Sequence, residues 1–153
     1  MDIIRRNTDY ALRAMVNLAE HYKKQPLSTK TISTEDGVSY QLACKLMQKL
    51  HNARLVRSYM GPKGGFQLSR DPSRISLLEV IEAMQGPIGL NRCLLNLAAC
   101  PRQPDCPVSK KLAKLQKYMS NYLGSVTLDE LSRRRSMKGK GKVNISNPKR
   151  RRR

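Results

Sequence analysis

The chain has 153 residues, of which 39% are hydrophobic and 27% are charged, and its formal net charge at pH 7 is +19. This length is typical of one domain with a hydrophobic core, and the hydrophobic fraction excludes a chain that is disordered throughout. No apolar run approaches the roughly 18 residues of a membrane span, and the N-terminus lacks the apolar region of a secretory signal, so we expect a cytoplasmic protein with no membrane partner. The basic excess favours a polyanion such as nucleic acid.

The positive charge is concentrated near the C-terminus. Residues 132–153 contain eleven Lys and Arg residues and no acid, so the other 131 residues carry the remaining +8. This segment is also rich in Gly, Ser and Asn, and we interpret it as a disordered basic tail. Its last five residues fit either a nuclear localisation signal or an arm that binds phosphate groups without sequence preference. A membrane-surface role would need an apolar or aromatic anchor beside the tail, which the sequence lacks.

The first predicted helix covers residues 8–24. Its apolar residues recur at helical spacing, and Asn7 or Thr8 can cap its start. A second, shorter helix is predicted over residues 29–36, with Ser28 as its N-cap.

A third helix follows a turn at Gly37. Ser39 caps it, and its apolar stripe runs from residue 42 to residue 50. Two short helices joined by a glycine turn, the second with a polar outer face, are typical of a helix-turn-helix. The second helix of this motif reads bases with the outward residues near its N-terminus. The candidate DNA contacts on this helix are Ser39, Tyr40, Gln41, Lys45 and Lys49.

A β-hairpin is predicted directly after this motif. Residues 55–60 are strand-like, the glycine-rich stretch 61–65 cannot be helical, and residues 66–68 resume an extended alternation. A hairpin in this position is the wing of a winged helix-turn-helix, and its glycines let the backbone approach DNA closely. The candidate DNA contacts here are Arg57, Gly61, Pro62, Lys63 and Gly64.

The rest of the chain is predicted to contain three more helices around one loop. Ser76 begins a helix to about residue 84 with a capping box, Pro107 suits the first turn of a long helix to about residue 123, and Thr127 begins a last short helix. The long helix lies outside the winged module, so its apolar stripe needs a cover, which a twofold partner would supply. The stripe consists of Leu112, Leu115, Met119, Tyr122 and Leu123.

These elements predict a mainly α fold with a small β-hairpin wing. We expect a winged helix-turn-helix DNA-binding region over residues 1–70, a connecting helix, cysteine loop and dimerisation helix over residues 71–131, and the disordered basic tail over residues 132–153. An enzyme has little support, because no Ser/His/Asp set or paired carboxylates lie at useful spacing and only two histidines exist.

Three of the four cysteines, Cys93, Cys100 and Cys106, lie in one short loop. Gaps of six and five residues separate them, which is wider than the tight pairs of many structural zinc sites. Three thiolates suit an iron–sulfur cluster and leave one position open. The residues alone favour a metal, with a cluster only slightly ahead of zinc, and a loop of free thiols or a redox disulfide stays open as the alternative. We interpret the fourth cysteine, Cys44, as a small packing residue of the third helix.

The order of these parts resembles the bacterial winged-helix regulators typified by IscR, NsrR and CymR. The resemblance covers roughly residues 1 to 131 and is carried by TDYALR at 8–13, the helix at 39–50, GPKGGF at 61–66, SLLEVI at 76–81 and the cysteine loop. It implies a homodimer with two winged heads and crossing dimerisation helices. In several members the cysteine loop holds an iron–sulfur cluster whose state controls DNA binding, whereas members of the CymR kind lack the cysteines and respond to protein partners.

Because this chain has all three cysteines of the family loop, the resemblance places it among the cluster binders and implies that Cys93, Cys100 and Cys106 are the iron ligands. Asp9 lies in a motif like that of NsrR, where the matching Asp reaches a 4Fe–4S cluster across the dimer. Asp9 is therefore the candidate fourth ligand, and 4Fe–4S is favoured over 2Fe–2S. Two alternatives stay open: Asp9 can simply favour the dipole of the first helical turn, and His21 or His51 could be the ligand instead.

The implied function is a DNA-binding transcriptional repressor that senses nitric oxide, redox or iron–sulfur status through the cluster. The alternative is a metal-independent winged-helix regulator or scaffold controlled by protein interaction. Two positions depart from the family pattern. The family wing usually reads Arg-Gly-Pro-Gly-Gly-Gly, but Met60 replaces its Arg and Lys63, a substitute cation, replaces the first Gly of the triplet. Ser109 stands where the IscR type has a histidine after its last cysteine.

Overall fold

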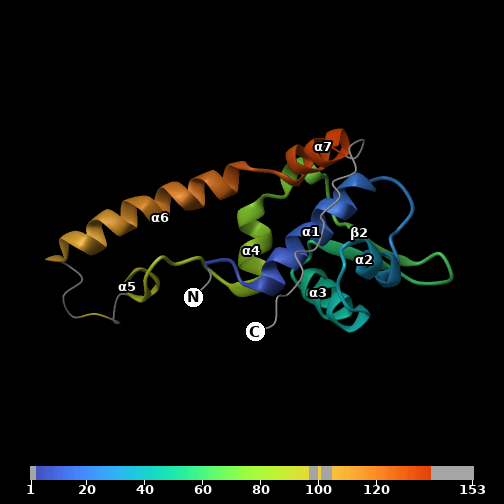
Figure 1. Ribbon diagram of the computed structural model, residues 1–153, viewed down its shortest axis with the longest axis horizontal. Coiled ribbons are helices and arrows are strands. Elements are labelled where there is room, and N and C mark those ends of the chain that lie inside the picture. The colour runs from blue at the N-terminus through green and yellow to red at the C-terminus, as the bar shows by residue number, and fades with distance from the viewer. Residues whose placement is uncertain (1–2, 97–99, 101–104, 139–153) are drawn as a thin grey trace, which may run out of the picture.

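A computed structural model of the chain describes residues 3–96, 100 and 105–138. A helical head carries a two-stranded hairpin, and one long helix projects from it (Figure 1). This arrangement confirms the predicted mainly α fold with a hairpin wing. The elements are α1 (Arg6–Glu20), α2 (Thr29–Glu35), α3 (Tyr40–Asn52), β1 (Val56–Tyr59), β2 (Gly65–Leu68), the 3-10 helix η1 (Pro72–Arg74), α4 (Leu77–Gln85), α5 (Arg92–Leu95), α6 (Pro107–Ser125) and α7 (Leu128–Lys138).

The head is built around α1. Its buried residues recur every three or four positions, so most of its circumference faces other elements, with α4 and α7 packed against it together with α3 and β2. Ile32 of α2, Met47 of α3 and Leu128 of α7 reach the same core, and none is more than 1% exposed. No helix in the described part of the chain is both long and apolar enough to span a membrane.

Serine side chains begin three helices as the sequence predicted. Ser28, Ser39 and Ser76 accept hydrogen bonds from the backbone N–H groups three positions ahead, at 3.1, 3.2 and 3.2 Å. Each bond satisfies one of the N–H groups that the first turn of a helix leaves unpaired. These starts were predictable because the cap and its donor are near neighbours in the sequence.

The predicted N-cap of α1, Asn7 or Thr8, was wrong. Arg5 occupies the cap position without a side-chain bond, and Thr8 is buried inside the helix. The amide of Gln85, 77 positions further along, takes over the role of a cap: its Oε1 accepts from Thr8 Oγ1 at 2.8 Å and from the Arg5 N–H at 2.9 Å. This contact joins the start of α1 to the end of α4, so no local pattern could reveal it.

The last helix is longer than predicted. α7 extends through Lys138, so the boundary expected between residues 131 and 132 falls inside it. Arg133 and Arg134 form ion pairs with Asp129 and Glu130 one turn earlier, at 3.0 and 2.9 Å, and pairs at this spacing support a helix. The rest of the predicted basic tail, 139–153, lies outside the described residues.

The hairpin is tied to the head by a short bridge. β1 and β2 pair antiparallel, with Val56 opposite Leu68 at the base and Tyr59 opposite Gly65 towards the tip. The backbone groups of Leu27 and Phe66 exchange two hydrogen bonds, of 3.0 and 2.8 Å, which fix the hairpin against the segment that precedes α2. A Cβ at Gly65 would lie 2.3 Å from the Leu27 carbonyl oxygen, so only glycine fits there.

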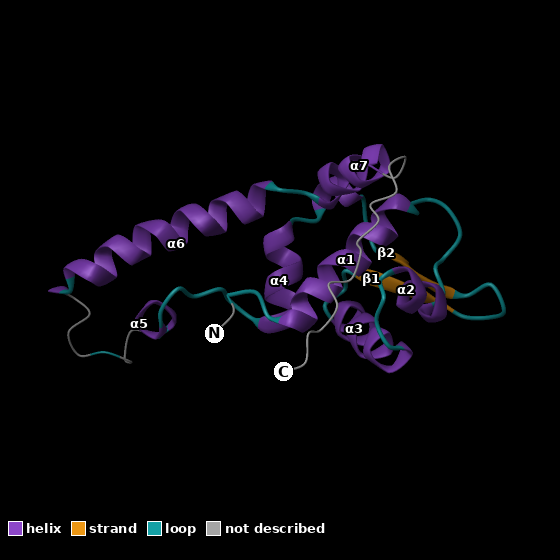
Figure 2. Cartoon of the chain, viewed as in Figure 1, coloured by secondary structure: helices purple, strands orange, loops and turns teal. Residues whose placement is uncertain are grey.

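The C-terminal end of α6 is joined to the head at a second bridge. Ser76 pairs with Thr127, the Leu77 N–H donates to Val126 O at 2.9 Å, and the Leu128 N–H donates to Ile75 O at 3.0 Å. α6 also packs against α4 near this end, and its N-terminal part extends away from the head towards α5 (Figure 2). The long helix therefore meets the head through its last turns.

α3 ends in a Schellman motif with an unusual residue. The Leu55 N–H bonds Leu50 O at 3.0 Å, and the Arg54 N–H bonds His51 O at 2.9 Å. Arg54 has a φ of +59°, in the left-handed region that this motif normally fills with glycine. No local pattern predicts this turn, because the glycine that usually marks it is missing.

Replacing Arg54 with glycine should stabilise the protein. The left-handed conformation disfavours an L residue by roughly 1–2 kcal/mol, and the greater freedom of glycine in the unfolded chain offsets part of that, so we expect a gain of about 0.5–1 kcal/mol. Thermal unfolding should show a midpoint higher by about 1–4 °C. The neighbouring Ala53 has a negative φ, so Ala53→Gly should lower the midpoint instead; a rise in both variants would contradict the explanation.

Candidate nucleic-acid interface and cysteine loop

The N-terminal end of α3 presents a polar surface to solvent. α3 buries Leu46, Met47 and Leu50 on one side, and this packing fixes which side chains face outwards. The predicted contact residues at this end are exposed, and Tyr40 is 58% exposed although it is a large aromatic residue. The outward residues are Ser39, Tyr40, Gln41 and Lys45.

Tyr40 and Cys44 interact one turn apart on this helix. The side-chain hydrogen bond to Cys44 raises the pKa of Tyr40 above its ordinary value. The half-buried position of Cys44 agrees with a packing residue, but its contact with an exposed candidate DNA-binding residue was missed. The i, i+4 spacing was the available signal.

Lys49 has a structural contact that the sequence did not indicate. Its Nζ donates to Met84 O at 2.7 Å and joins α3 to the C-terminal part of α4. A hollow of about 360 Å³ adjoins this contact, between the start of α1 and α3. Arg5, Arg6 and Lys45 line it together with Lys49, so the start of α1 adds two cations to the predicted surface.

The wing carries most of its predicted contacts near its tip. Gly61 has a φ of +102°, and a Cβ on Gly64 would lie 2.2 Å from Tyr59 O, so both positions of this turn require glycine. Pro62 and Lys63 are exposed, and Met60, in place of the family arginine, is 96% exposed. Arg57 is also exposed but lies next to the base of the hairpin.

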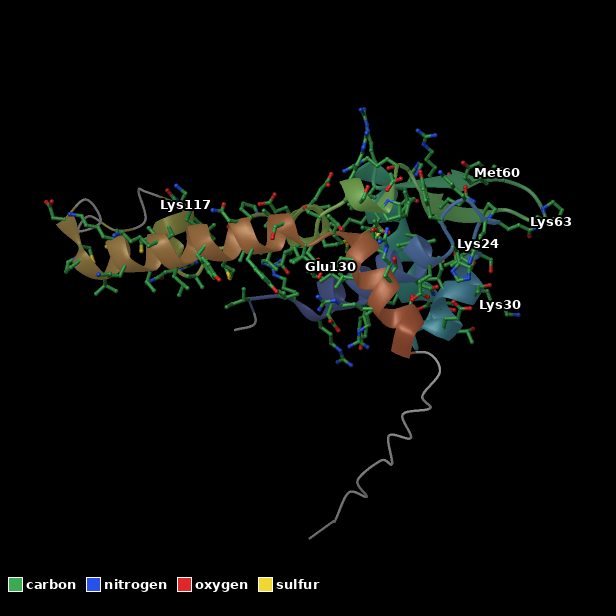
Figure 3. All side chains as sticks on the ribbon, turned by 90° about the horizontal axis from the view of Figure 1, so that it is seen from above. Lys24, Lys30, Met60, Lys63, Lys117 and Glu130 are labelled. Carbon is green, nitrogen blue, oxygen red and sulfur yellow. The ribbon has the colours of Figure 1, made fainter. Side chains whose placement is uncertain are left out.

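Two further lysines, Lys24 and Lys30, were missed. Figure 3 shows both at the same end of the molecule as Met60 and Lys63, whereas Lys117 lies at the opposite end on α6. They come from the α1–α2 connection and from α2. Nothing in the spacing of Lys24 and Lys30 in the sequence indicates a position beside the wing. The bridge between Leu27 and Phe66 brings the segment before α2 to the wing.

The cysteine loop leads into α6. Cys93 lies on α5, Cys100 lies between the helices, and Cys106 is the N-cap of α6; all three are half-buried. The Cys106 Sγ accepts a hydrogen bond from the Ser109 N–H at 3.5 Å. A sulfur at a helix N-terminus faces N–H donors and the positive end of the helix dipole, which favour negative charge there.

Among the described residues of one chain, the three cysteines do not form a metal-holding group with one another or with the other candidate ligands. Over the described residues, no three or more His, Cys, Asp and Glu side chains form a group that could hold a metal. Asp9 pairs with Arg13 at 2.8 Å on the surface of α1. His21 and His51 each bond a backbone oxygen near them in sequence, Asn17 O at 3.0 Å and Val56 O at 3.2 Å. The donor types of the loop nevertheless fit three of the thiolate positions of an iron–sulfur cluster.

α6 exposes a line of large apolar side chains. Val108, Leu115 and Tyr122 repeat every seven residues, and Tyr118 lies between them and is 71% exposed. This is the spacing of a coiled-coil seam. Of the predicted stripe, Leu115 and Tyr122 belong to this exposed line, whereas Leu112, Met119 and Leu123 are half-buried.

Comparison with known proteins extends this picture. Residues 4–134 match the family Rrf2, described as iron-dependent transcriptional regulator. The chain is 33% identical over 122 residues to the HTH-type transcriptional regulator IscR of Xenorhabdus nematophila, which covers 80% of this chain and 74% of that protein. It is 31% identical over 140 residues to the protein rrf2 of Nitratidesulfovibrio vulgaris, covering 90% and 91%.

Solved structures give the same result. CymR, the global cysteine regulator of B. subtilis, superposes with a TM-score of 0.76 at 27% identity and covers 88% of this chain and 98% of its own. T. potens IscR superposes with a TM-score of 0.67 at 26% identity, covering 95% and 93%. The predicted resemblance to regulators of the IscR and CymR type is confirmed, and IscR and CymR are regulators rather than enzymes.

Proposed function

This chain belongs to the Rrf2 family of transcriptional regulators, and from that premise we propose that it is a cytoplasmic, homodimeric repressor that senses nitric oxide, redox or iron–sulfur status through a cluster bound by Cys93, Cys100 and Cys106. The observation that supports the DNA-binding part is the exposed polar start of α3 together with the wing, whose turn is formed by glycines and carries an exposed lysine. A helix and a wing in this order fit adjacent grooves of one duplex.

The sensing part rests on the donor set of the cysteine loop. Three half-buried thiols on a single loop match the thiolate ligands of a cluster, and three are one short of a closed structural zinc site. Such a cluster would supply a centre that reacts with nitric oxide and oxidants. Cys106 would hold its own position through the Ser109 N–H, and the loop would keep the first turn of α6 in place.

The dimer is supported by the exposed seam of α6. A second copy would cover the seam with the same residues, as a twofold interface requires. Release of the cysteine loop would free the start of both α6 helices and change the distance between the two heads. DNA binding would respond because each head must meet its own half-site.

The first test is the absorption spectrum of anaerobically purified protein, with iron, sulfide and zinc assayed on the same sample. A broad violet band with stoichiometric iron and sulfide is expected. Operator binding by holo and apo protein is then compared at one salt concentration, because a basic chain binds DNA in a salt-dependent way. Equal operator affinity in the two forms would overturn the sensing mechanism.

A second candidate is a metal-independent regulator controlled by a protein partner. The good superposition with CymR favours it, since the fold is shared with that regulator. Colourless protein without metal after attempted reconstitution would select this candidate, and the dimer and the DNA surface would stand unchanged.

Gln41→Ala should relax sequence preference on DNA. A Gln at the start of a recognition helix can pair with adenine through two hydrogen bonds, and losing such a pair reduces discrimination by about 1–3 kcal/mol at one base pair. Lys63→Gln, which removes a wing cation, should weaken binding to all sequences alike and lower the salt dependence. Binding to single-base variants of the operator distinguishes the two effects, and an unchanged preference in Gln41→Ala would contradict the base-reading role.

Asp9→Ala tests the fourth cluster ligand. Asp9 and Arg13 form one surface ion pair, so replacing either residue breaks the pair, but only Asp9→Ala removes the carboxylate. We expect the pair itself to contribute less than about 1 kcal/mol to stability. If Asp9 is the ligand, Asp9→Ala should lose iron faster under nitric oxide and change the spectrum, whereas Arg13→Ala should match wild type. If Asp9→Ala and wild type had the same spectra and the same rates of iron loss, Asp9 would not be a cluster ligand and its role would be limited to the first turn of α1.

A further inference from the structure

We propose that the hollow at the base of the hairpin is a binding pocket for a phosphate-class oxyanion. It has a volume of about 580 Å³ and lies where α3 ends and β1 begins. Its described lining includes three arginines and no acidic residue. The polar lining residues are His51, Asn52, Arg54, Arg57, Ser69 and Arg70.

Two of the three arginines are available for an anion. Arg70 is already engaged, because its guanidinium pairs with Glu79 and its Nε donates to Arg74 O at 3.3 Å. Arg54 and Arg57 are exposed, and neither forms an ion pair with any described side chain. A guanidinium offers a planar fork of donors that matches phosphate geometry, so two of them beside one hollow favour this ligand class.

The walls of the pocket are held by hydrogen bonds to backbone carbonyl groups. Ser69 Oγ donates to Arg54 O at 2.7 Å, and the Ser69 N–H donates to Leu55 O at 3.0 Å. His51 Nδ1 donates to Val56 O at 3.2 Å. These bonds join the last turn of α3 to both strands, so Arg54 is held at its left-handed φ of +59° in a rigid frame. An arginine kept where glycine is normally preferred is a reason to look for a function.

The pocket shares Arg57 with the candidate DNA contacts, but it lies away from the N-terminal end of α3 and from the wing tip, which are expected to read DNA. His51 lies eleven residues after Tyr40, or about 17 Å along the helix. The base of the hairpin lies about 10 Å from the Tyr59 end of β1. An oxyanion bound here would contact the end of α3 and the wing together.

The test is calorimetric titration of the full chain with inorganic phosphate at constant ionic strength. Arg54→Asn removes the guanidinium, and Asn tolerates a positive φ better than most residues. Lys23→Asn is the matched control, because Lys23 also has a left-handed φ, +63°, and lies outside the pocket. If Arg54→Asn does not fold, Arg54→Gly replaces it.

We expect saturable binding that is about tenfold weaker in Arg54→Asn and changed less than about twofold in Lys23→Asn. Equal weakening in both variants would show a general counterion effect and overturn the pocket. This part of the test requires neither a cluster nor an operator.

A second titration identifies the source of the phosphate group. If the pocket takes a phosphate of the DNA backbone, bound duplex should abolish the phosphate heat, and Arg54→Asn should weaken duplex binding more than Lys23→Asn does. If it takes a free phosphate compound, inorganic phosphate should bind equally well with duplex present. Both results support a phosphate pocket, whereas an Arg54→Asn variant that behaves as wild type in both titrations would refute it.

Discussion

Cys106→Ser is expected to abolish cluster binding while leaving the fold of α6 intact. Serine is a preferred N-cap, so its hydroxyl can accept the Ser109 N–H that Cys106 Sγ accepts in the native chain. Cys106→Ala would remove both functions and would weaken the helix start by about 1 kcal/mol. The serine variant therefore separates the role of the thiolate from that of the cap.

The loss of iron should be large. Removing a residue that only hydrogen-bonds a metal ligand typically costs about 10–100-fold in affinity, and a lost ligand should cost more. The measurement is iron and sulfide per chain together with the violet absorbance after anaerobic reconstitution. Cys44→Ser is the control, because Cys44 lies on α3 and not in the loop. A Cys106→Ser protein with wild-type iron and colour would exclude Cys106 as a ligand.

Leu115→Arg is expected to convert the proposed dimer into a monomer. Leu115 lies in the exposed seam of α6, and α6 itself has no acidic residue to pair with the new charge. A twofold interface contains each substitution twice, and each lost leucine contributes about 1.5–3 kcal/mol of burial. The dimer should therefore weaken by at least about 3 kcal/mol, more than a hundredfold in its dissociation constant.

Ala113→Arg is the matched control for this prediction. Ala113 is also exposed on α6, but at about 100° per residue it lies on nearly the opposite side of the helix from Leu115. Light scattering across a concentration series should show monomers for Leu115→Arg and dimers for Ala113→Arg, and only the former should lose tight operator binding. A dimeric Leu115→Arg protein would place the interface elsewhere.

The sequence predicted those features that depend on near neighbours. The serine caps, the glycine turn of the wing and the proline start of α6 were correct because each is decided within a few residues. The start of α1 was wrong because Gln85 supplies its partner from a distant helix. Arg54 was missed for the opposite reason, since the left-handed turn is present without its usual glycine.

The candidate site also contains residues that local sequence patterns predict and residues that only the packing of distant elements reveals. The exposed start of α3 and the wing tip follow from helical and hairpin periodicity, so their residues could be named in advance. The contact of Lys49 with Met84 O, the cations at the start of α1 and the approach of Lys24 and Lys30 to the wing depend on how elements pack. Whether Asp9 meets the cysteines depends on the second chain of the proposed dimer, because the contact would cross between two copies.

The attachment of α6 to the head near one end makes the helix a lever. Its 19 residues span about 28 Å, so a rotation of about 10° at the bridge between Ser76 and Thr127 moves the far end by about 5 Å. One turn of DNA is about 34 Å long, so 5 Å along the duplex corresponds to about 50° of rotation around it. In the proposed dimer, a rearrangement at the cysteine loop too small to disturb either head would thus turn one recognition helix away from its groove while the other stays in place.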